Sequence, residues 1–316
     1  MKNLTKKTNE GLSRRRVIKN AAMGSLLLGL PPSLFGQQGL SASSLGRNLT
    51  LLTRQGRNVV VAVGTDDVVV VDGGHESDAA ELMQEINNLA QGKPVSTLFN
   101  TNWRPEHCGL NYQLGPAGTT IIAHENTRLW QNNDFFVTWE NRHYQPMPTL
   151  AQANQTYYKT GSLTLDNEAV DYGTISQFLT DGDMYIHFKE ENVLIVGDML
   201  TVGTYPLLDY VTGGWIGGAQ ESTRALLELA DEDTLIIPAS GGVQRRAALE
   251  VQLQMLDHAY DMVANAYRTG RSLDQFMATS PMADYADLYG NADLFTELLY
   301  RGTWYHVTGR AVPGII

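Results

Sequence analysis

Residues 100–111 read Asn-Thr-Asn-Trp-Arg-Pro-Glu-His-Cys-Gly-Leu-Asn and directly follow a short apolar run, Val95–Phe99. The apolar run predicts a buried β-strand, and the polar stretch after it predicts a loop at one edge of a sheet. Arg104, Glu106 and His107 lie within four residues of one another in this loop. Because functional side chains are often carried by loops on a rigid scaffold, this loop is the first candidate site.

The segments around this loop alternate between strand and helix patterns. Two β-branched runs, Asn58–Val63 and Val68–Val71, predict a hairpin that ends at Asp72, and a helical stripe follows as far as Ala90. Residues 130–160 are rich in Asn, Gln and Tyr and predict an irregular excursion. Further strands are expected at 119–123, 174–179, 184–188, 192–196 and 234–238, and helices at 222–230, 247–268, 273–277 and 292–300. Such interleaving favours an α/β layered domain.

Composition excludes several classes of partner. The chain has 316 residues, is 43% hydrophobic and carries a net charge of −11. Residues 1–42 contain seven basic residues and one acidic residue, or +6, so the remainder carries −11 − 6 = −17. Such a body should repel nucleic acid and anionic lipid. The single cysteine, Cys108, excludes an intramolecular disulfide.

The N-terminal segment has the features of an export signal. Residues 13–19, Ser-Arg-Arg-Arg-Val-Ile-Lys, resemble the twin-arginine motif, and the apolar stretch 21–35 is broken by two prolines. That stretch is too short to hold the mature protein in a membrane as a stable span. We therefore expect a signal peptide over residues 1–42, export through the twin-arginine translocase, and a periplasmic mature domain over residues 43–316.

The order of motifs along the chain resembles the metallo-β-lactamase superfamily. The loop 100–111 is similar to the family's metal loop, His-x-His-x-Asp-His, and Asp72-Gly73-Gly74 is similar to the turn before it. Gly197-Asp198 matches the Gly-Asp pair that bridges two metals, and residues 237–243 align with Pro-Gly-His-Gly-x-Val. The resemblance implies a four-layer αββα sandwich with added C-terminal helices over 245–305, and a site at the rim between two sheets.

The resemblance also assigns seven ligand positions to this sequence. Two match, because His107 stands at the third histidine of the metal loop and Asp198 at the bridging aspartate. Glu106 replaces the aspartate of the metal loop. Four positions lack a normal ligand: Asn102, Arg104, Leu179 and Ser240. Leucine offers no lone pair and arginine carries a permanent positive charge, so we expect the first metal site to be lost.

Two arrangements of the remaining acidic groups stay open. Glu106, His107 and Asp198 could hold a single divalent metal, and zinc is the metal that carboxylate and imidazole ligands suit. Alternatively no metal binds, and the Arg104 guanidinium lies between Glu106 and Asp198 to neutralise them. The pocket rim is expected to include Asp72, His75, Trp103 and Asp209.

Three hypotheses about function follow from these arrangements. The first is a protein with a binding or accessory role, without zinc hydrolase activity, that recognises an unidentified small molecule. The second is a single-metal hydrolase of an ester, thioester or amide, in which the metal lowers the pKa of bound water from 15.7 toward about 7. The third is a metal-independent enzyme with His107 and Glu106 as acid and base. Cys108 is expected to serve packing.

Overall fold

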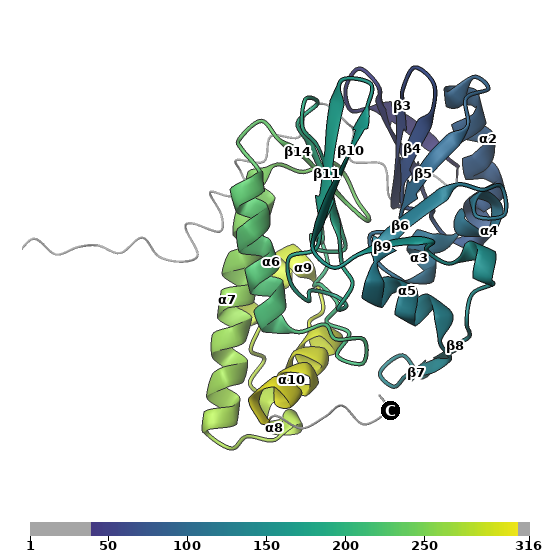
Figure 1. The fold of residues 1–316 in the computed structure, drawn as a ribbon. Coiled ribbons are helices and arrows are strands. Elements are labelled where there is room, and N and C mark those ends of the chain that lie inside the picture. The colour runs from purple at the N-terminus through teal and green to yellow at the C-terminus, as the bar shows by residue number, and fades with distance from the viewer. Residues whose placement is uncertain (1–38, 309–316) are drawn as a thin grey trace, which may run out of the picture.

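The computed structural model describes residues 39–308 and contains two large sheets that pack face to face (Figure 1). The first sheet has the strand order β1-β2-β3-β4-β5-β6-β9. Its strands are β1 (Ser41–Ser44), β2 (Leu49–Arg54), β3 (Arg57–Val63), β4 (Val68–Val71), β5 (Val95–Phe99), β6 (Thr120–His124) and β9 (Gln155–Tyr157). The boundary expected near residue 42 falls within β1, which pairs antiparallel with β2.

The second sheet has the order β10-β11-β12-β13-β14. Its strands are β10 (Thr160–Leu165), β11 (Glu168–Gly173), β12 (Tyr185–Phe188), β13 (Val193–Gly197) and β14 (Leu235–Pro238). A separate hairpin is formed by β7 (Phe135–Val137) and β8 (Arg142–Tyr144). Parallel pairing joins β4, β5, β6 and β9 in the first sheet and β13 and β14 in the second.

Helices cover the outer face of each sheet. Against the first sheet lie α2 (Ala79–Ala90) and α4 (Asn111–Leu114), while α3 (Pro105–Cys108) and α5 (Glu125–Asn132) lie at the ends of its strands, with the short 3-10 turns η1 (Glu76–Asp78) and η2 (Thr149–Ala151) nearby. On the second lie α6 (Ile216–Leu229) and α7 (Arg246–Arg268), followed by α8 (Leu273–Met277), η3 (Ala283–Tyr285), α9 (Ala286–Tyr289) and α10 (Asp293–Thr308). The predicted αββα sandwich with C-terminal helices is confirmed.

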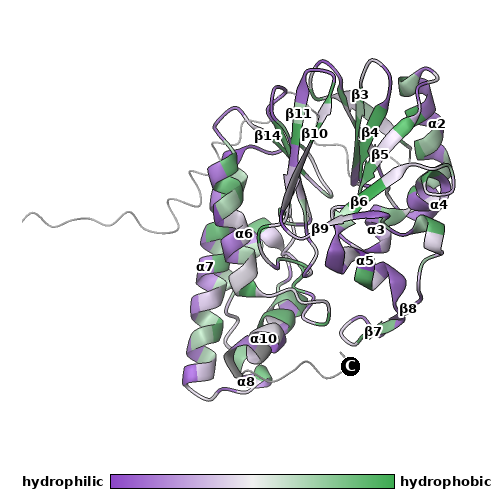
Figure 2. Cartoon of the chain, viewed as in Figure 1, coloured by the Kyte–Doolittle hydropathy of each residue, from purple (hydrophilic) through white to green (hydrophobic). Residues whose placement is uncertain are grey.

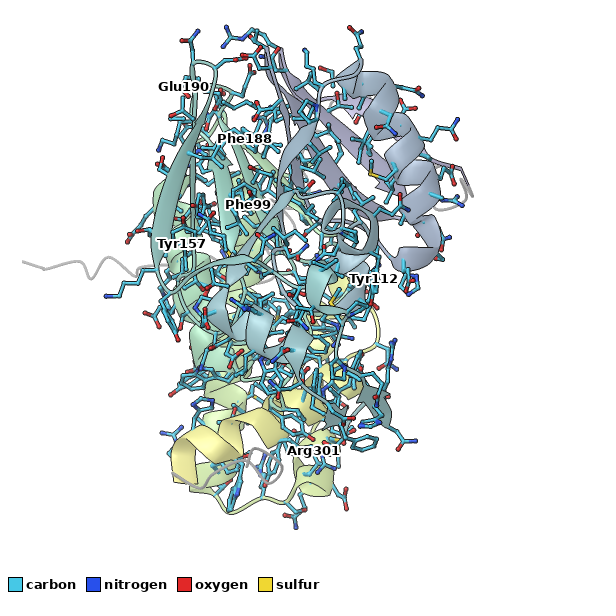
Figure 3. The ribbon with its side chains drawn as sticks, turned by 45° about the vertical axis from the view of Figure 1, so that its right-hand side comes forward. Phe99, Tyr112, Tyr157, Phe188, Glu190 and Arg301 are labelled. Atoms are coloured by element: carbon cyan, nitrogen blue, oxygen red, sulfur yellow. The ribbon has the colours of Figure 1, made fainter. Side chains whose placement is uncertain are left out.

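Three apolar clusters hold these four layers together. The cluster between the sheets includes Phe99 and Phe188, which Figure 3 labels in the interior, and Phe99 contacts Tyr172 at 4.9 Å between ring centroids. A second cluster joins the first sheet to Leu82 and Ile86 of α2, and a third joins the second sheet to α6, α7 and α10. Figure 2 shows apolar residues concentrated along the strands. Strands buried on both faces read as continuous Val-rich runs, as β3 and β4 do.

Several element boundaries differ from the sequence-based expectation. Residues 174–179 form no strand, and β10 and β11 precede them instead. The excursion 130–160 contains the β7–β8 hairpin and β9, where an irregular segment was expected. Helix α6 begins at Ile216, six residues before the expected start. The expected start was too late because Gly217 and Gly218 have a low helix propensity and hide the first turn in the sequence pattern. No helix within residues 39–308 is long and apolar enough to cross a membrane.

Candidate functional site

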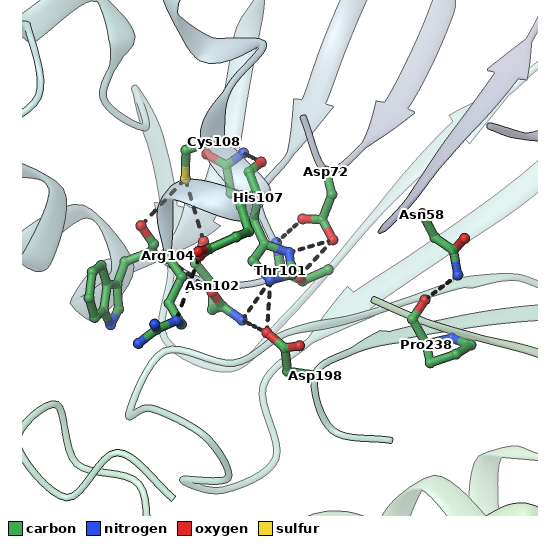
Figure 4. Close-up of polar contacts among 12 residues, drawn as sticks. Asn58, Asp72, Thr101, Asn102, Arg104, His107, Cys108, Asp198 and Pro238 are labelled. Carbon is green, nitrogen blue, oxygen red and sulfur yellow. Dashed lines mark hydrogen bonds and ion pairs between the residues drawn. The ribbon is translucent and has the colours of Figure 1, made fainter. Parts of the chain in front are cut away.

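The candidate site lies where β4, β5 and β13 end at the same edge of the two sheets (Figure 4). The turn after β4 supplies Asp72, the loop after β5 and helix α3 supply Asn102 to His107, and the end of β13 supplies Asp198. Because parallel strands end together at one edge, residues far apart in the chain converge here. The structure therefore brings together His107 and Asp198, as the sequence predicted.

Asp72 fixes the start of the loop that follows β5, through two hydrogen bonds to Thr101. It has a left-handed backbone (φ 62°), a conformation that aspartate tolerates better than most residues. Its Oδ1 accepts a hydrogen bond from the Thr101 backbone N–H at 2.8 Å, and its Oδ2 accepts one from the Thr101 hydroxyl at 2.8 Å. Asp72 is buried, so its expected place at the pocket rim is wrong. Its carboxylate lies in the interior because both of its oxygens accept hydrogen bonds from Thr101.

His107 lies between two carboxylates. Its Nδ1 is 2.9 Å from Asp72 Oδ2, and its Nε2 is 2.8 Å from Asp198 Oδ2. Burial opposes a positive charge on the ring, but Asp72 and Asp198 outweigh it and raise the pKa of His107 to about 10. At neutral pH the ring is therefore an imidazolium with a proton on each nitrogen.

Asp198 is a counter-ion of this imidazolium. Burial acts to raise its pKa, but the adjacent His107 and a hydrogen bond from Asn102 hold the pKa of this carboxyl well below its usual range. Asn102 Nδ2 donates to Asp198 Oδ2 at 3.0 Å, while Asn102 Oδ1 accepts from the Arg104 backbone N–H at 3.0 Å. Asn102 thus occupies a former ligand position as a bridge between Asp198 and the loop backbone.

Arg104 forms ion pairs with a second group of carboxylates. Its guanidinium contacts Glu140, lies 3.7 Å from Glu106 Oε2 through Nε, and lies 3.8 Å from Asp209 Oδ2 through Nη1. It also lies 5.4 Å from the ring centroid of Trp103. The predicted contact with Glu106 is confirmed, whereas the predicted contact with Asp198 is wrong, because Asp198 is already paired with His107.

Glu140 is a site residue that the sequence did not reveal. It lies between β7 and β8 and accepts a hydrogen bond from the Tyr144 hydroxyl at 2.6 Å. Its position, 36 residues after Arg104, lies in the segment expected to be irregular. The adjacent Trp139 donates from Nε1 to Asp209 Oδ1 at 2.8 Å. An acidic residue beside tryptophan in a polar segment was the only available signal, and it is too common to be specific.

The remaining predicted positions are spread over different environments. Asp209 is fully buried and cannot form part of a rim. Leu179 packs in the core of the second sheet and its helices, while Ser240 is exposed and its backbone bridges to Arg57. His75 is exposed and lines a cavity together with Trp103. Leu179 and Ser240 therefore add no polar side chain to the His107 cluster.

Cys108 has the packing role that the sequence predicted. Its thiol is buried and donates weakly to the backbone oxygens of Trp103 at 3.6 Å and Asn102 at 3.7 Å. Burial raises the pKa of the Cys108 thiol far above its ordinary value. Because the thiolate is the nucleophile, this residue is an inert structural cysteine.

A model of the metallo-beta-lactamase superfamily matches residues 52–241, more than half of the chain. The chain belongs to the metallo-β-lactamase superfamily. The matched residues include the site described above and every strand except β1 and the start of β2, so the family assignment and the four-layer fold agree. No curated protein matches the sequence significantly.

Solved structures show the same fold at low sequence identity. A metallo-beta-lactamase from Pontibacter korlensis aligns with a TM-score of 0.56 and 14% identity, over 69% of this chain and 99% of that one. The DIM-1 metallo-beta-lactamase aligns with a TM-score of 0.55 and 18% identity, over 70% and 98%. VMB-1 aligns with a TM-score of 0.57 and 13% identity, over 71% and 100%. These likenesses establish the fold.

Zinc is common in this superfamily, but the residues present here do not fit it. Within the described range 39–308, no group of three or more His, Cys, Asp or Glu side chains is arranged to hold a metal ion. Glu106 faces Arg104, and His107 directs both ring nitrogens at carboxylates. Asn102, Arg104 and Leu179, which stand at three further ligand positions of the family motif, supply no imidazole or carboxylate to complete a zinc shell.

Proposed function

We propose that this protein is a non-hydrolytic member of the metallo-β-lactamase superfamily with a binding or accessory role. The observation that supports it is the hydrogen bond between His107 Nε2 and Asp198 Oδ2, at 2.8 Å. In the family these two positions bind metal, whereas here a proton of the imidazolium joins them. Fixed side-chain charges on His107 and Arg104 take over the neutralisation of the acidic residues.

The rival hypotheses both require Glu106 close to His107: the single-metal hydrolase needs it beside His107 and Asp198, and the metal-free acid–base enzyme needs it beside His107. The Glu106 carboxylate instead lies 3.7 Å from Arg104, whose charge lowers the pKa of Glu106 against the effect of burial. A carboxylate of Glu106 that is held by arginine is a weak general base, and an imidazolium whose two N–H groups both face carboxylates is poorly placed as a general acid. The geometry therefore favours binding over hydrolysis.

The test is a zinc titration of the chelator-treated mature protein, combined with an assay of a chromogenic cephalosporin. We expect no stoichiometric zinc by calorimetry, the same melting temperature with and without chelator, and no zinc-dependent turnover. The positive control for both measurements is the DIM-1 metallo-beta-lactamase, titrated and assayed under the same conditions. One zinc per wild-type chain, together with turnover near about 1–1000 per second, would show the proposal to be wrong.

A further inference from the structure

The β7–β8 hairpin, residues 135–144, lies apart from the two large sheets, below α5 in the view of Figure 1. Strand β7 pairs only with β8. Within residues 39–308, no backbone hydrogen bond joins residues 134–146 to the rest of the chain. A two-stranded hairpin is marginally stable by itself, so side-chain contacts must hold this one in place.

The hairpin packs through a small apolar cluster of its own. The buried members of this cluster are Trp103, Val137 and Tyr144, none of which belongs to the three large clusters. Trp103 meets Phe135 and Tyr144 edge-on, each at 4.9 Å between ring centroids. A cavity of about 200 Å³ remains at this interface, lined by these three rings and by Cys108. A segment attached through a small, incompletely packed cluster opens at a lower free energy than the core does.

Polar contacts hold the tip of the hairpin over Arg104. Glu140 pairs with the Arg104 guanidinium, and the Trp139 ring centroid lies 5.8 Å from the guanidinium carbon. Trp139 Nε1 also donates to Asp209 Oδ1 at 2.8 Å. The side chain of Arg104 is 9% exposed, and that of Asp209 is fully buried. The tip of the hairpin therefore covers both residues.

The same interface contains polar atoms that are not paired. Among the described residues, Trp103 Nε1, Arg104 Nη1 and Glu106 Oε2 are buried without a hydrogen-bond partner. Most buried polar groups are paired, because an unpaired group has lost its hydrogen bonds to water. Water can reach these atoms when the hairpin moves away. The hydrogen bonds gained then offset part of the aromatic contact that is lost, which brings the free energies of the closed and open arrangements closer together.

We propose that the β7–β8 hairpin is a lid that opens as a unit and admits a ligand to Arg104 and Asp209. Opening breaks the tip contacts of Glu140 and Trp139 and lifts the hairpin from Trp103, while the pairing of β7 with β8 is kept. The admission of a ligand rests on the proposed binding role. The opening itself is tested without zinc and without a hydrolysis assay, so either proposal can fail without the other.

Cys108 is the probe of opening, because it lines the cavity under the hairpin and is the single cysteine of the chain. Burial keeps its thiol unreactive in the closed protein, so N-ethylmaleimide labels it only after opening. The labelling rate of the mature protein is followed by mass spectrometry, in chelator, from zero urea to the unfolding midpoint. We expect a rate nearly independent of urea well below the midpoint, because local opening exposes little surface, whereas global unfolding gives a steep dependence.

Two variants weaken the contacts at the tip. Glu140→Gln removes the ion pair with Arg104, and Trp139→Phe keeps an aromatic ring but removes the donor to Asp209. Each should raise the labelling rate of Cys108 in the absence of urea about tenfold, since each removes one hydrogen bond of the closed lid. Thermal unfolding checks that both variants remain folded.

Asp134→Asn is the matched control for loss of an acidic group. Asp134 pairs with His143 inside the same hairpin, so its replacement should leave the labelling rate unchanged. Labelling of wild type only with the steep urea dependence of global unfolding would overturn the proposal. Equal rates for wild type, Glu140→Gln and Trp139→Phe would also overturn it, as would an equal rise in Asp134→Asn.

Discussion

At the scale of single residues, two cations account for the arrangement of the acidic groups. His107 holds Asp72 and Asp198, and Arg104 holds Glu106, Glu140 and Asp209. Buried carboxylates are tolerated only when paired, hydrogen-bonded or protonated. Asp183 illustrates the last case: it is buried with one oxygen unpaired, and burial together with Asp198 raises its pKa to about 7.

Replacing Arg104 should destabilise the protein strongly. Arg104→Ala leaves three nearly buried carboxylates without their common cation, and breaking a buried ion pair costs about 3–5 kcal/mol. The measurement is the free energy of unfolding from urea titrations at neutral pH, with chelator present. Arg224→Ala is the control, since its exposed pair with Asp257 should be worth at most about 1 kcal/mol. Equal losses in the two variants would contradict the assigned role of Arg104.

The His107 ion pairs should give stability a defined dependence on pH. The folded pKa of about 10 lies above the unfolded value of about 6.5, so the stabilisation is complete below about pH 6.5. It is lost as pH rises through 10. Asp198 acts in the opposite sense: its folded pKa is depressed, so its contribution is present above its unfolded pKa and is lost as pH falls.

We expect the unfolding free energy of wild type to fall between pH 8 and 10, and that of His107→Gln to stay nearly flat over the same range. Asp72, Asp183 and Asp198 are the acidic groups near His107, and Asp183 has largely titrated by pH 8. The difference between the two curves therefore isolates the imidazolium. Parallel curves would mean that His107 is neutral in the folded protein.

At the scale of elements, the site depends on a close backbone contact between the turn after β4 and helix α3. Gly73 N–H donates to the His107 carbonyl at 2.7 Å, and Gly109 N–H donates to the Gly74 carbonyl at 2.8 Å. A Cβ on Gly109 would lie 2.4 Å from the His75 carbonyl carbon. This contact sets the distance between Asp72 and His107, because each is attached to one side of it.

Gly109→Ala should therefore separate the turn from α3. Overpacking against fixed backbone costs about 1–3 kcal/mol, and the loss of the Asp72–His107 pair would add to it. Gly242→Ala is the matched control, since a Cβ there meets nothing within 4 Å and its effect should be small. The check is urea unfolding together with the histidine ring signals of both variants by NMR. An unchanged stability and an unshifted His107 signal in Gly109→Ala would contradict this account.

At the scale of the whole molecule, the charge distribution separates the leader from the domain. The seven basic residues of positions 1–42 all lie between positions 2 and 19, outside the described range, and we propose that they direct export by the twin-arginine route to the periplasm. We propose that the rest of the chain, with its charge of −17, is repelled by anionic surfaces such as nucleic acid and anionic lipid.

Replacing Arg14 and Arg15 together with lysine should strand the precursor in the cytoplasm. The motif requires the arginine pair, and lysine keeps the charge, so a defect would come from recognition and not from loss of basicity. The measurement is the distribution of the protein between periplasmic and cytoplasmic fractions, with Lys6→Arg as the control. Normal periplasmic accumulation of the double variant would refute the export proposal.

The sequence by itself determined the fold class and half of the strand positions, namely β3 to β6 and β12 to β14, and its resemblance to the family motifs implied the loss of four metal-ligand positions. Valine runs such as β4, and the motif order from Asp72 to Asp198, are local signals that do not depend on distant contacts. The prediction of a strand over 174–179 was wrong. These residues have an apolar pattern, but no neighbouring strand pairs with their backbone.

Only the tertiary structure decided where the charges pair. Glu140, Asp209 and Arg104 are separated by tens of residues, and nothing local tells which carboxylate a long side chain will reach. The same holds for the aromatic cavity, whose walls come from Trp103 on one side of α3 and Phe135 and Tyr144 in the distant hairpin. Contacts of this kind are set by packing of whole elements, and packing is a property of the folded chain.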